Sequence, residues 1–345
     1  MNVNHPLYRE ELREICALDL PFEKFRNRTI AITGASGLVG GALLRALHAL
    51  NAARGLNLNL IALGRRPEAL AERYADLDGV SFLKYDARAE LPDELRADYI
   101  VHAASNAHPL AFSSDPVGTL QANVLGAMRL LERARACDAR MLLISSGEIY
   151  GDDPGLELGF DEQSFGPVNP MNPRACYPEG KRAAEAFCAA YWQQYGVDAL
   201  AARLTYTFGP GITRENSRAD AQFLRRALAG EDIVLKSDGS QIRSYCYVSD
   251  AAAALIAILL RGEAGQAYNV SNPNCTASIR EYAGAMAELS GVALRFELPP
   301  EMERRGYSRV TRAILRADKL TALGWKPRYD LREGLRRTLA IAAEK

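Results

Sequence analysis

The sequence predicts an α/β fold in which a parallel sheet carries helices on both faces. Two observations lead to this prediction: short apolar runs alternate with helical segments, and the first run passes through a glycine-rich turn directly into a helix. A chain of 345 residues, 48% of them hydrophobic, can bury a large core. We therefore expect a Rossmann-type, doubly wound parallel sheet with a smaller, interleaved C-terminal lobe that binds substrate.

The predicted strands are apolar runs bounded by turn residues or by helical segments. The first lies within RTIAITGASG (28–37), and the others are NLIALG (59–64), VSFLKYD (80–86), YIVHAA (99–104), RMLLISS (140–146) and VDALAARLTY (197–206). Because helical segments separate several of these runs, the strands are expected to pair in parallel.

The chain divides into a lead-in and two larger parts. Residues 1–27 predict a short amphipathic helical lead-in that packs on the rest, and residues 28–205 predict the dinucleotide-binding domain. Residues 206–345 have shorter elements between Gly, Pro and Ser-containing loops, and they predict mainly the substrate-binding lobe. Within them, we expect 240–262 to return to the dinucleotide-binding domain.

Composition and charge narrow the class of partner. Lys plus Arg and Asp plus Glu both number 42, so no overall field recruits nucleic acid or a membrane surface. The apolar run 251–260 is too short to span a bilayer and predicts a buried helix. Six scattered cysteines without a C-x-x-C pair, and an acidic first segment, predict a cytoplasmic protein without structural zinc or another metal.

The motif TGASGLVG (33–40) follows the first predicted strand and leads into a helix. It places Gly34, Gly37 and Gly40 in a G-x-x-G-x-x-G spacing, with Ser36 and Leu38 between them. Glycines permit close approach of the backbone, and amides at a helix start can hold a pyrophosphate. A tight turn alone is the alternative, but the strand and helix context favours a nicotinamide cofactor loop.

Two arginines follow the second predicted strand. An enzyme that holds the 2′-hydroxyl of NAD normally has an acidic residue there, whereas Arg65 and Arg66 suit the 2′-phosphate of NADP. The alternative is a solvated pair at a strand end. Asp86, which closes the third strand, either accepts from the adenine amino group or caps a loop. We favour NADP as the cofactor, with NAD as the alternative.

Tyr177 and Lys181 lie in CYPEGKRAAEAF (176–187), which predicts a helix start. Their spacing puts both side chains on one face, where an ammonium and a bound nicotinamide ring favour the phenolate form of the tyrosine. Such a phenolate can take the proton of an alcohol. Ser145 and Ser146 end the predicted strand 140–146, where ligands of open α/β sheets bind, and Ser146 is the preferred partner of the substrate oxygen.

These motifs together resemble the extended short-chain dehydrogenase/reductases of the NAD-dependent epimerase/dehydratase family, which act on nucleotide sugars. The resemblance covers about residues 28–340 and rests on TGASGLVG, HAAS (102–105), SSGEIYG (145–151), YPEGK (177–181) and RSYCYVSD (243–250). The stretch 148–185 is most similar to the UDP-glucuronate decarboxylase branch. A homodimer that pairs through the helices near 116–136 and 177–196 is a further expectation from this resemblance.

The resemblance implies roles for individual residues. The catalytic positions it implies are Ser146, Glu148, Tyr177 and Lys181. Cofactor-binding positions include Ala103 and Ala104, and substrate-binding positions include Ser146, Tyr206, Arg243 and Arg312. At Tyr206 the sequence departs from the family, whose R-x-x-N motif has an asparagine that contacts the sugar diphosphate.

The implied chemistry is transient oxidation at carbon four of the sugar, after which the ketone permits decarboxylation, epimerisation or dehydration. Glu148 favours decarboxylation, and Gly147 disfavours 4,6-dehydration because dehydratases carry an acidic residue at that position. A 4-epimerase remains the nearest alternative. An NADPH-dependent ketone reductase and a non-catalytic NADP-responsive binding protein are rivals from other classes.

Overall fold

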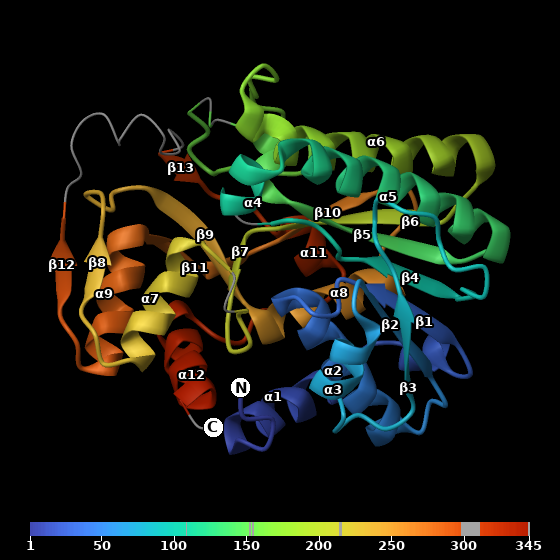
Figure 1. Cartoon of the computed structure of the whole chain (residues 1–345), viewed down its shortest axis with the longest axis horizontal. Helices are drawn as coiled ribbons and strands as arrows, with labels where there is room; N and C mark the ends of the chain where they lie inside the picture. The colour runs from blue at the N-terminus through green and yellow to red at the C-terminus, as the bar shows by residue number, and fades with distance from the viewer. Residues whose placement is uncertain (108, 152, 154, 214–215, 298–310, 344–345) are drawn as a thin grey trace.

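A seven-stranded sheet, parallel throughout, forms the centre of the molecule (Figure 1). The structure is a computed structural model and describes residues 1–107, 109–151, 153, 155–213, 216–297 and 311–343. The strand order is β10-β6-β5-β4-β1-β2-β3. Strands β2 and β3 are added on one side of β1, and β4 and the later strands are added on its other side. The predicted doubly wound, Rossmann-type fold is confirmed.

Six of the seven strands of this sheet fall close to predicted apolar runs, and the central ones, such as β1 and β5, are buried along nearly their whole length. The seven strands are β1 (Thr29–Thr33), β2 (Asn59–Gly64), β3 (Val80–Lys84), β4 (Tyr99–His102), β5 (Arg140–Ser146), β6 (Ala199–Leu204) and β10 (Ala267–Val270). The run 197–206 divides into β6 and β7 (Tyr206–Phe208), since the chain leaves the large sheet at Thr205 and pairs with β9.

Helices cover both faces of the large sheet, as Figure 1 shows. One face carries α5 (Pro116–Cys137) and α6 (Cys176–Tyr195), and the other carries α2 (Leu38–Arg54) and α8 (Val248–Arg261). Shorter elements around them are η1 (Phe22–Phe25), α3 (Pro67–Arg73), α4 (Pro109–Ser114), η2 (Gly147–Tyr150), η3 (Pro173–Ala175) and α11 (Asp318–Ala322). Every residue of α8 except Arg261 is buried, so the predicted buried helix over 251–260 is confirmed.

The smaller lobe is built on a second sheet with the order β11-β9-β13, in which β7 also pairs with β9. Its elements are α7 (Ala219–Leu228), β8 (Ile233–Leu235), β9 (Ile242–Tyr247), β11 (Asn272–Ser278), α9 (Ile279–Ser290), β12 (Leu294–Phe296), β13 (Arg312–Ala313) and α12 (Leu331–Ala343). Aromatic rings from β7, β9 and α9 fill its core, with Tyr245 and Tyr282 stacked at 4.8 Å between centroids.

The segment 240–262, which the sequence assigns to the dinucleotide-binding part, divides between the two sheets. Strand β9 forms the centre of the small sheet, whereas α8 packs against α2 below the large one. Strand β10 then joins the edge of the large sheet beside β6. Within the described part of the chain, no helix is long and apolar enough to cross a membrane.

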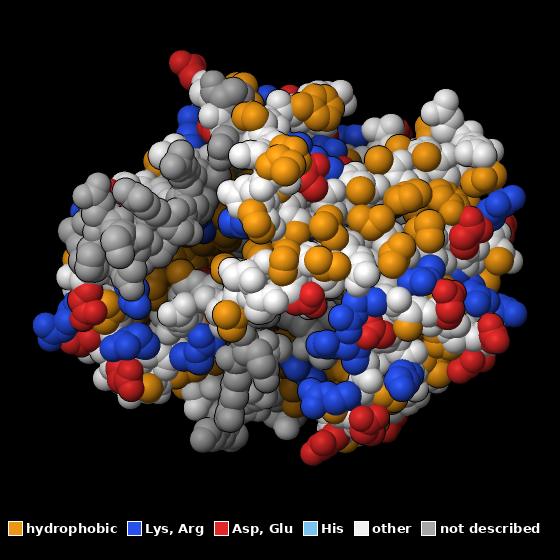
Figure 2. Space-filling view, turned by 45° about the horizontal axis from the view of Figure 1, so that its top comes forward, with side chains coloured by type: hydrophobic (Ala, Val, Ile, Leu, Met, Phe, Trp, Pro, Cys, Tyr) orange, Lys and Arg blue, Asp and Glu red, His pale blue; other side chains and the backbone are white. Residues whose placement is uncertain are grey.

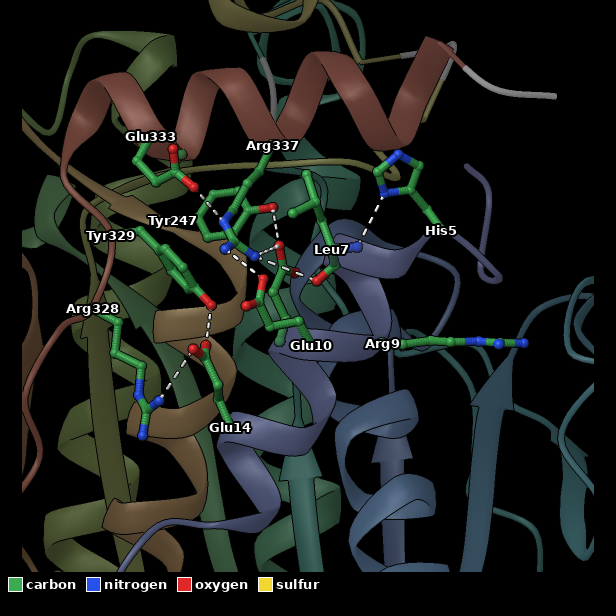
Figure 3. Close-up of polar contacts among 12 residues, drawn as sticks. His5, Leu7, Arg9, Glu10, Glu14, Tyr247, Arg328, Tyr329, Glu333 and Arg337 are labelled. Carbon is green, nitrogen blue, oxygen red and sulfur yellow. Dashed lines mark hydrogen bonds and ion pairs between the residues drawn. The ribbon is translucent and has the colours of Figure 1, made fainter.

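Helix α1 (Pro6–Cys16) connects the two lobes at the foot of the molecule. It packs on α2 and α8 of the larger part and on α12 of the smaller lobe. Figure 3 shows Arg337 of α12 pointing toward Glu10 of α1, with 2.7 Å between Nη2 and Oε2. The fully buried carboxylate of Glu11 accepts a hydrogen bond of 2.9 Å from the Tyr247 hydroxyl and lies 3.5 Å from Arg337. The predicted lead-in is therefore an anchored helix.

Burial of Glu11 makes this anchor sensitive to pH. Burial raises the pKa of Glu11 from about 4.5 to about 7, and this effect outweighs the opposing effects of the Tyr247 hydrogen bond and the Arg337 charge. Between pH 4.5 and about pH 7, the Glu11 carboxyl group is therefore protonated to a greater extent in the folded state than in the unfolded state. The contribution of Glu11 to stability is greatest below about pH 4.5 and is lost as the pH rises through about 7.

We predict that Glu11→Gln flattens the dependence of the melting temperature on pH. From pH 5 to pH 8 the wild-type free energy of unfolding should fall by on the order of 2 kcal/mol more than that of the variant, whose amide cannot titrate. Thermal melts followed by circular dichroism measure this difference. The matched control is Glu10→Gln, which removes the other carboxylate of α1 that contacts Arg337. Because the Glu10 side chain is partly exposed, this variant should keep the wild-type dependence of stability on pH. Equal slopes for wild type and Glu11→Gln would contradict the prediction.

Candidate active site

A cavity of about 840 Å³ runs along the carboxyl edge of the large sheet and continues between the two lobes. Its walls come from the turn after β1, the end of β4, the end of β5, the start of α6 and the β6–β7 segment, together with residues of the smaller lobe. Parallel strands bring their carboxyl ends to one edge, where ligands of open α/β sheets bind. The predicted residues that line it are Gly34, Gly37, Leu38, Gly40, Ala103, Ser146, Glu148, Tyr177, Lys181 and Tyr206.

The glycine turn brings the backbones of β1 and β4 into close contact. Gly34 has a φ of +69°, and a Cβ there would lie 2.6 Å from the carbonyl carbon of Ala103. A Cβ at Gly40 would lie 2.5 Å from the Gly34 carbonyl oxygen. Gly37 is the N-cap of α2 and has no side chain to cover the helix start. The turn thus leaves amides of the first helical turn open toward the cavity, which fits an anionic group.

Basic side chains lie near the same turn. Arg65 and Arg66 follow β2 and are exposed, and the positive charge of Arg65 helps to lower the pKa of Asp86. The main cause of that lowered pKa is Arg88, whose side chain and backbone N–H both bond the Asp86 carboxylate. Asp86 is therefore held in its own loop. Arg73 was missed by sequence reasoning; its Nη1 donates to the carbonyl of Ser36, 3.0 Å away.

The Tyr177 ring lies in the first turn of α6 and is buried, stacked on Phe112 at 4.7 Å between centroids. Burial raises the pKa of Tyr177, and the negative charge of Glu148 raises it further. A hydrogen bond with Ser146 and the charge of Arg218 act in the opposite direction. The protein groups alone therefore favour the neutral phenol. The expectation that the Lys181 ammonium and a bound nicotinamide ring together favour the phenolate stays a prediction.

Lys181 is buried one helical turn beyond Tyr177. Its Nζ donates to the Ile144 carbonyl oxygen at 2.8 Å and lies 6.0 Å from the centroid of the Tyr177 ring. Burial lowers the pKa of Lys181 to about 8, and the negative charge of Glu185 partly compensates. The ammonium is therefore the main form at neutral pH.

Ser146 and Glu148 lie where β5 turns into η2. The Ser146 hydroxyl accepts from the backbone N–H of Glu148 at 3.2 Å, which fixes the turn. The Glu148 carboxylate forms an ion pair with Arg174 of η3, with 3.1 Å between Oε2 and Nη1. Arg174 also lies over the Phe112 ring. The Glu148 carboxylate and the Arg174 guanidinium thus border the same cavity as Tyr177.

The far end of the cavity carries Tyr206 and Arg218. The guanidinium of Arg243 stacks on the Tyr206 ring, 4.3 Å from its centroid, and donates to the Gln241 side chain at 2.8 Å. Arg312 donates to two backbone carbonyls in the loop before η3, at 3.2 and 2.5 Å. Neither Arg243 nor Arg312 is among the residues that line the cavity.

The structure therefore brings together most, but not all, of the residues that the sequence singled out. Those that are not among the residues lining the cavity are Ser36, Arg65, Arg66, Asp86, Ala104, Arg243 and Arg312. Sequence reasoning missed Arg174, Arg218 and Phe112. Arg174 directly precedes the Tyr177 helix and could have been noticed there, whereas the other two reach the site only through the tertiary fold. Among the described residues, no cluster of His, Cys, Asp and Glu could hold a metal ion.

Comparisons with known sequences identify relatives of the chain. The sequence profile of the "NAD dependent epimerase/dehydratase family" matches residues 30–271. UDP-glucuronic acid decarboxylase 1 of Xenopus tropicalis is 34% identical over 321 residues, which cover 92% of this chain and 72% of that protein. The Danio rerio protein of the same name is also 34% identical, covering 96% and 78%. UDP-glucuronic acid decarboxylase 5 of Arabidopsis thaliana is 31% identical, covering 90% and 87%.

Solved structures share the fold. DesIV, a dTDP-glucose 4,6-dehydratase from Streptomyces venezuelae with NAD bound, superposes with a TM-score of 0.77 at 24% identity, covering 91% of this chain and 96% of that one. The epimerase Mth375 from Methanothermobacter thermautotrophicus gives 0.79 at 24% identity, covering 98% and 96%. At these identities the likeness establishes the architecture and leaves the reaction open.

We predict that Gly34→Ala abolishes detectable binding of a nicotinamide cofactor. The methyl group would push β4 away at Ala103, and the glycine turn would lose its shape. Fluorescence titration with NADPH and with NADH measures the loss.

The matched control is Gly79→Ala, a position with a φ of +75° and no heavy atom within 4 Å of the added methyl. Both variants carry a similar backbone strain of roughly 1–2 kcal/mol, but the control should bind cofactor as the wild type does. If both variants bind equally well, the close contact at Gly34 has no role in the cofactor site.

Proposed function

The chain belongs to the NAD-dependent epimerase/dehydratase family, and from this premise we propose that it is a nucleotide-sugar-modifying enzyme similar in reaction to the UDP-glucuronate decarboxylases. The observation that carries the proposal is the carboxylate of Glu148, which borders the same cavity as Ser146 and Tyr177 and forms an ion pair with Arg174. The curated relatives with identities above 30% are named UDP-glucuronic acid decarboxylases.

A nicotinamide cofactor fits the glycine turn, because any side chain at Gly34 would fill the space between β1 and β4. Gly34, Gly37, Leu38 and Lys181 are the residues that would hold it. When bound, it supplies the hydride acceptor, and later the donor, for carbon four of the sugar.

The chain's own groups manage the protons. Oη of Tyr177 takes the proton of the carbon-four hydroxyl, while the Ser146 hydroxyl donates to the same substrate oxygen. Since burial and Glu148 hold Tyr177 as a neutral phenol, the proton transfer depends on additional positive charge at the cavity. Lys181 contributes a buried ammonium on the same helix face.

A ketone at carbon four makes loss of a carboxylate from carbon five feasible. The bond between carbon five and the carboxylate breaks, carbon dioxide leaves, and the electron pair is delocalised onto the ketone oxygen. Carbon five must then take up one proton, and Glu148 lies in the cavity as a group able to transfer it. Arg174, paired with Glu148, provides a cation for the anionic substrate.

Dehydration is the less favoured branch. A dehydratase of this family has an acidic residue where this chain has Gly147, and a Cβ here would lie 3.0 Å from both methyl groups of Leu315. A larger side chain would therefore require Leu315 to move. A 4-epimerase remains the second candidate, because its chemistry needs Ser146 and Tyr177 but not Glu148.

For the cofactor, we propose NADP over NAD. Arg65 and Arg66 are exposed at the end of β2, and Arg73 bonds the glycine turn at Ser36. Guanidinium groups there suit a 2′-phosphate, and the carboxylate of Asp86 is already bound by Arg88.

We also propose a homodimer in the cytoplasm. Figure 2 shows hydrophobic side chains gathered over the face formed by α4, α5 and α6, and Leu110, Val117 and Leu120 are exposed there. Pairing of two copies through α5 and α6 would cover this face. All six cysteines are free thiols, which suits a reducing compartment.

We predict that the purified protein releases carbon dioxide from UDP-glucuronate over many turnovers without net consumption of nicotinamide cofactor. Tyr177→Phe should abolish this turnover and leave cofactor affinity nearly unchanged, because only the acid/base hydroxyl is removed. Carbon dioxide release and the mass of the nucleotide sugar are the measurements, extended to other UDP, GDP, CDP and dTDP sugars.

The matched control is Tyr195→Phe, an exposed tyrosine at the end of the same helix, which should keep full turnover. Glu148→Gln distinguishes decarboxylation from 4-epimerisation. We expect this variant to lose decarboxylation, and unchanged turnover of the nucleotide sugar would favour a 4-epimerase. Stoichiometric use of NADPH would indicate a ketone reductase, and cofactor binding without turnover on any sugar would indicate a binding protein.

We predict that Arg65→Ala weakens NADPH binding by about ten-fold or more and leaves NADH binding nearly unchanged, because a charge-assisted bond to phosphate contributes about 1.5–3 kcal/mol. Titration of both cofactors measures the ratio. Arg332→Ala, an exposed arginine of α12 paired with Glu288, is the control and should change neither affinity. An equal loss for both cofactors would exclude a phosphate contact at Arg65.

A further inference from the structure

Behind the catalytic side chains lies a buried ion pair that the mechanism does not use. The carboxylate of Glu185 on α6 is bound by Arg203 of β6, with contacts of 2.7, 3.1 and 3.2 Å. Both side chains are about nine-tenths buried. A buried pair of this kind is costly to desolvate, so its presence calls for a reason beyond stability.

Glu185 holds the strand that ends in Ser146. The Ser145 hydroxyl donates to the Glu185 carboxylate, and Lys181, one helical turn earlier, donates to the carbonyl of Ile144. Two adjacent residues of β5 are thus bonded to two residues of α6 on one helix face. These bonds fix strand and helix relative to one another immediately before Ser146.

The same pair also reaches the turn that carries Glu148. Arg203 donates to the Tyr150 hydroxyl at 2.9 Å, and Tyr150 in turn donates to Asn269 of β10 at 2.7 Å. Tyr150 ends η2, which begins directly after Ser146. Glu185 is therefore connected to β5 through Ser145 and to η2 through Arg203, and it lies on α6 itself.

We propose that Glu185 is a positioning residue that holds Lys181 in its charged form and fixes β5, α6 and η2 around the reacting atoms. Lys181 and Glu185 are four residues apart on α6, and Glu185 also borders a second cavity of about 290 Å³, which shares no lining residue with the larger one. This inference rests on the proposed catalytic role of Lys181.

Other groups that face Lys181 stay neutral in the working range of pH. Burial lowers the pKa of His102 on β4 to about 3, and burial raises the pKa of Cys188 on α6 to about 12. With protein groups alone around it, Tyr177 is also neutral, because burial raises its pKa. On these elements Glu185 is the carboxylate that offsets the loss of hydration at Lys181. Arg203 forms an ion pair with that carboxylate.

The direct test is the protonation of Lys181 followed by NMR in the full-length protein. The chain has only seven lysines, so selective ¹³Cε labelling of lysine gives few signals, and Lys181→Met identifies the one of interest. We predict that Glu185→Gln lowers the pH at which Lys181 titrates by about one unit or more, because a nearby opposite charge shifts a pKa by roughly 1–3 units. Glu185→Asp should restore the wild-type midpoint.

The matched control is Asp76→Asn, which removes the carboxylate partner of another buried arginine, Arg45, away from the cavity. This variant should leave the pH midpoint of the Lys181 titration unchanged. Should Glu185→Gln fail to fold because Arg203 is left unpaired, Glu185→Gln combined with Arg203→Met removes both charges and should show the same lowered midpoint. An unchanged midpoint in the folded variants would reduce Glu185 to a structural residue and overturn the proposal.

Turnover separates this inference from the proposed function. If both hold, the alkaline limb of the rate in Glu185→Gln moves to lower pH together with the Lys181 midpoint. A shifted midpoint in a protein that converts no nucleotide sugar would support the coupling of Glu185 to Lys181 and count against the proposed reaction.

Discussion

Parallel pairing of β1, β4, β5 and β6 is the constraint on which the site depends. Because these strands run in the same direction, their carboxyl ends meet at one edge, and residues far apart in the sequence line one cavity. Gly34, Ser146 and Tyr206 lie at the carboxyl ends of three different strands of this set. The close contact between Gly34 and Ala103 requires β1 and β4 to be direct neighbours, so the cofactor turn exists only within this strand order.

The smaller lobe is coupled to the sheet by continuous chain and by buried polar contacts. Strand β9 leads without a break into α8, which packs below the large sheet, and α1 contacts helices of both lobes. The carboxylate of Asp250 in α8 accepts from the backbone N–H groups of Arg328 and Tyr329, just before α12. These contacts hold the walls of the cavity on both sides.

The sequence was sufficient for the parts of the fold that depend on local patterns. The predicted runs 59–64 and 140–146 coincide with β2 and β5, since each is a buried apolar run bounded by turn residues. The sequence was not sufficient where contacts between residues far apart in the chain determine where a strand ends. The end of β6 could not be located because the Thr205 hydroxyl donates to Ser244 of a strand about forty residues later, after which the chain joins the other sheet.

The same distinction holds for the site. The spacing of Tyr177 and Lys181 and the three glycines of the turn are local features, and they line the cavity together. The partners of long charged side chains are not local: Arg243 stacks on Tyr206, and Arg312 binds a backbone segment far away in sequence, where sequence reasoning expected substrate contacts. Arg174 reaches the cavity because η3 directs it to Glu148, and this direction is set by the loop rather than by a motif.

Charge in the cavity explains how a protein with no net charge can favour an anionic ligand. The charged side chains among the described lining residues are Glu148, Arg174, Lys181 and Arg218, so the cations outnumber the carboxylate. Low-dielectric walls strengthen the field of such groups compared with the same charges on the surface. Arg174 is paired with Glu148, and Arg218 with Asp220, so an entering anion must compete with these carboxylates. In the proposed reaction, an anion that displaced Arg174 would free Glu148 for proton transfer, so that binding of a charged sugar and proton transfer would involve the same ion pair.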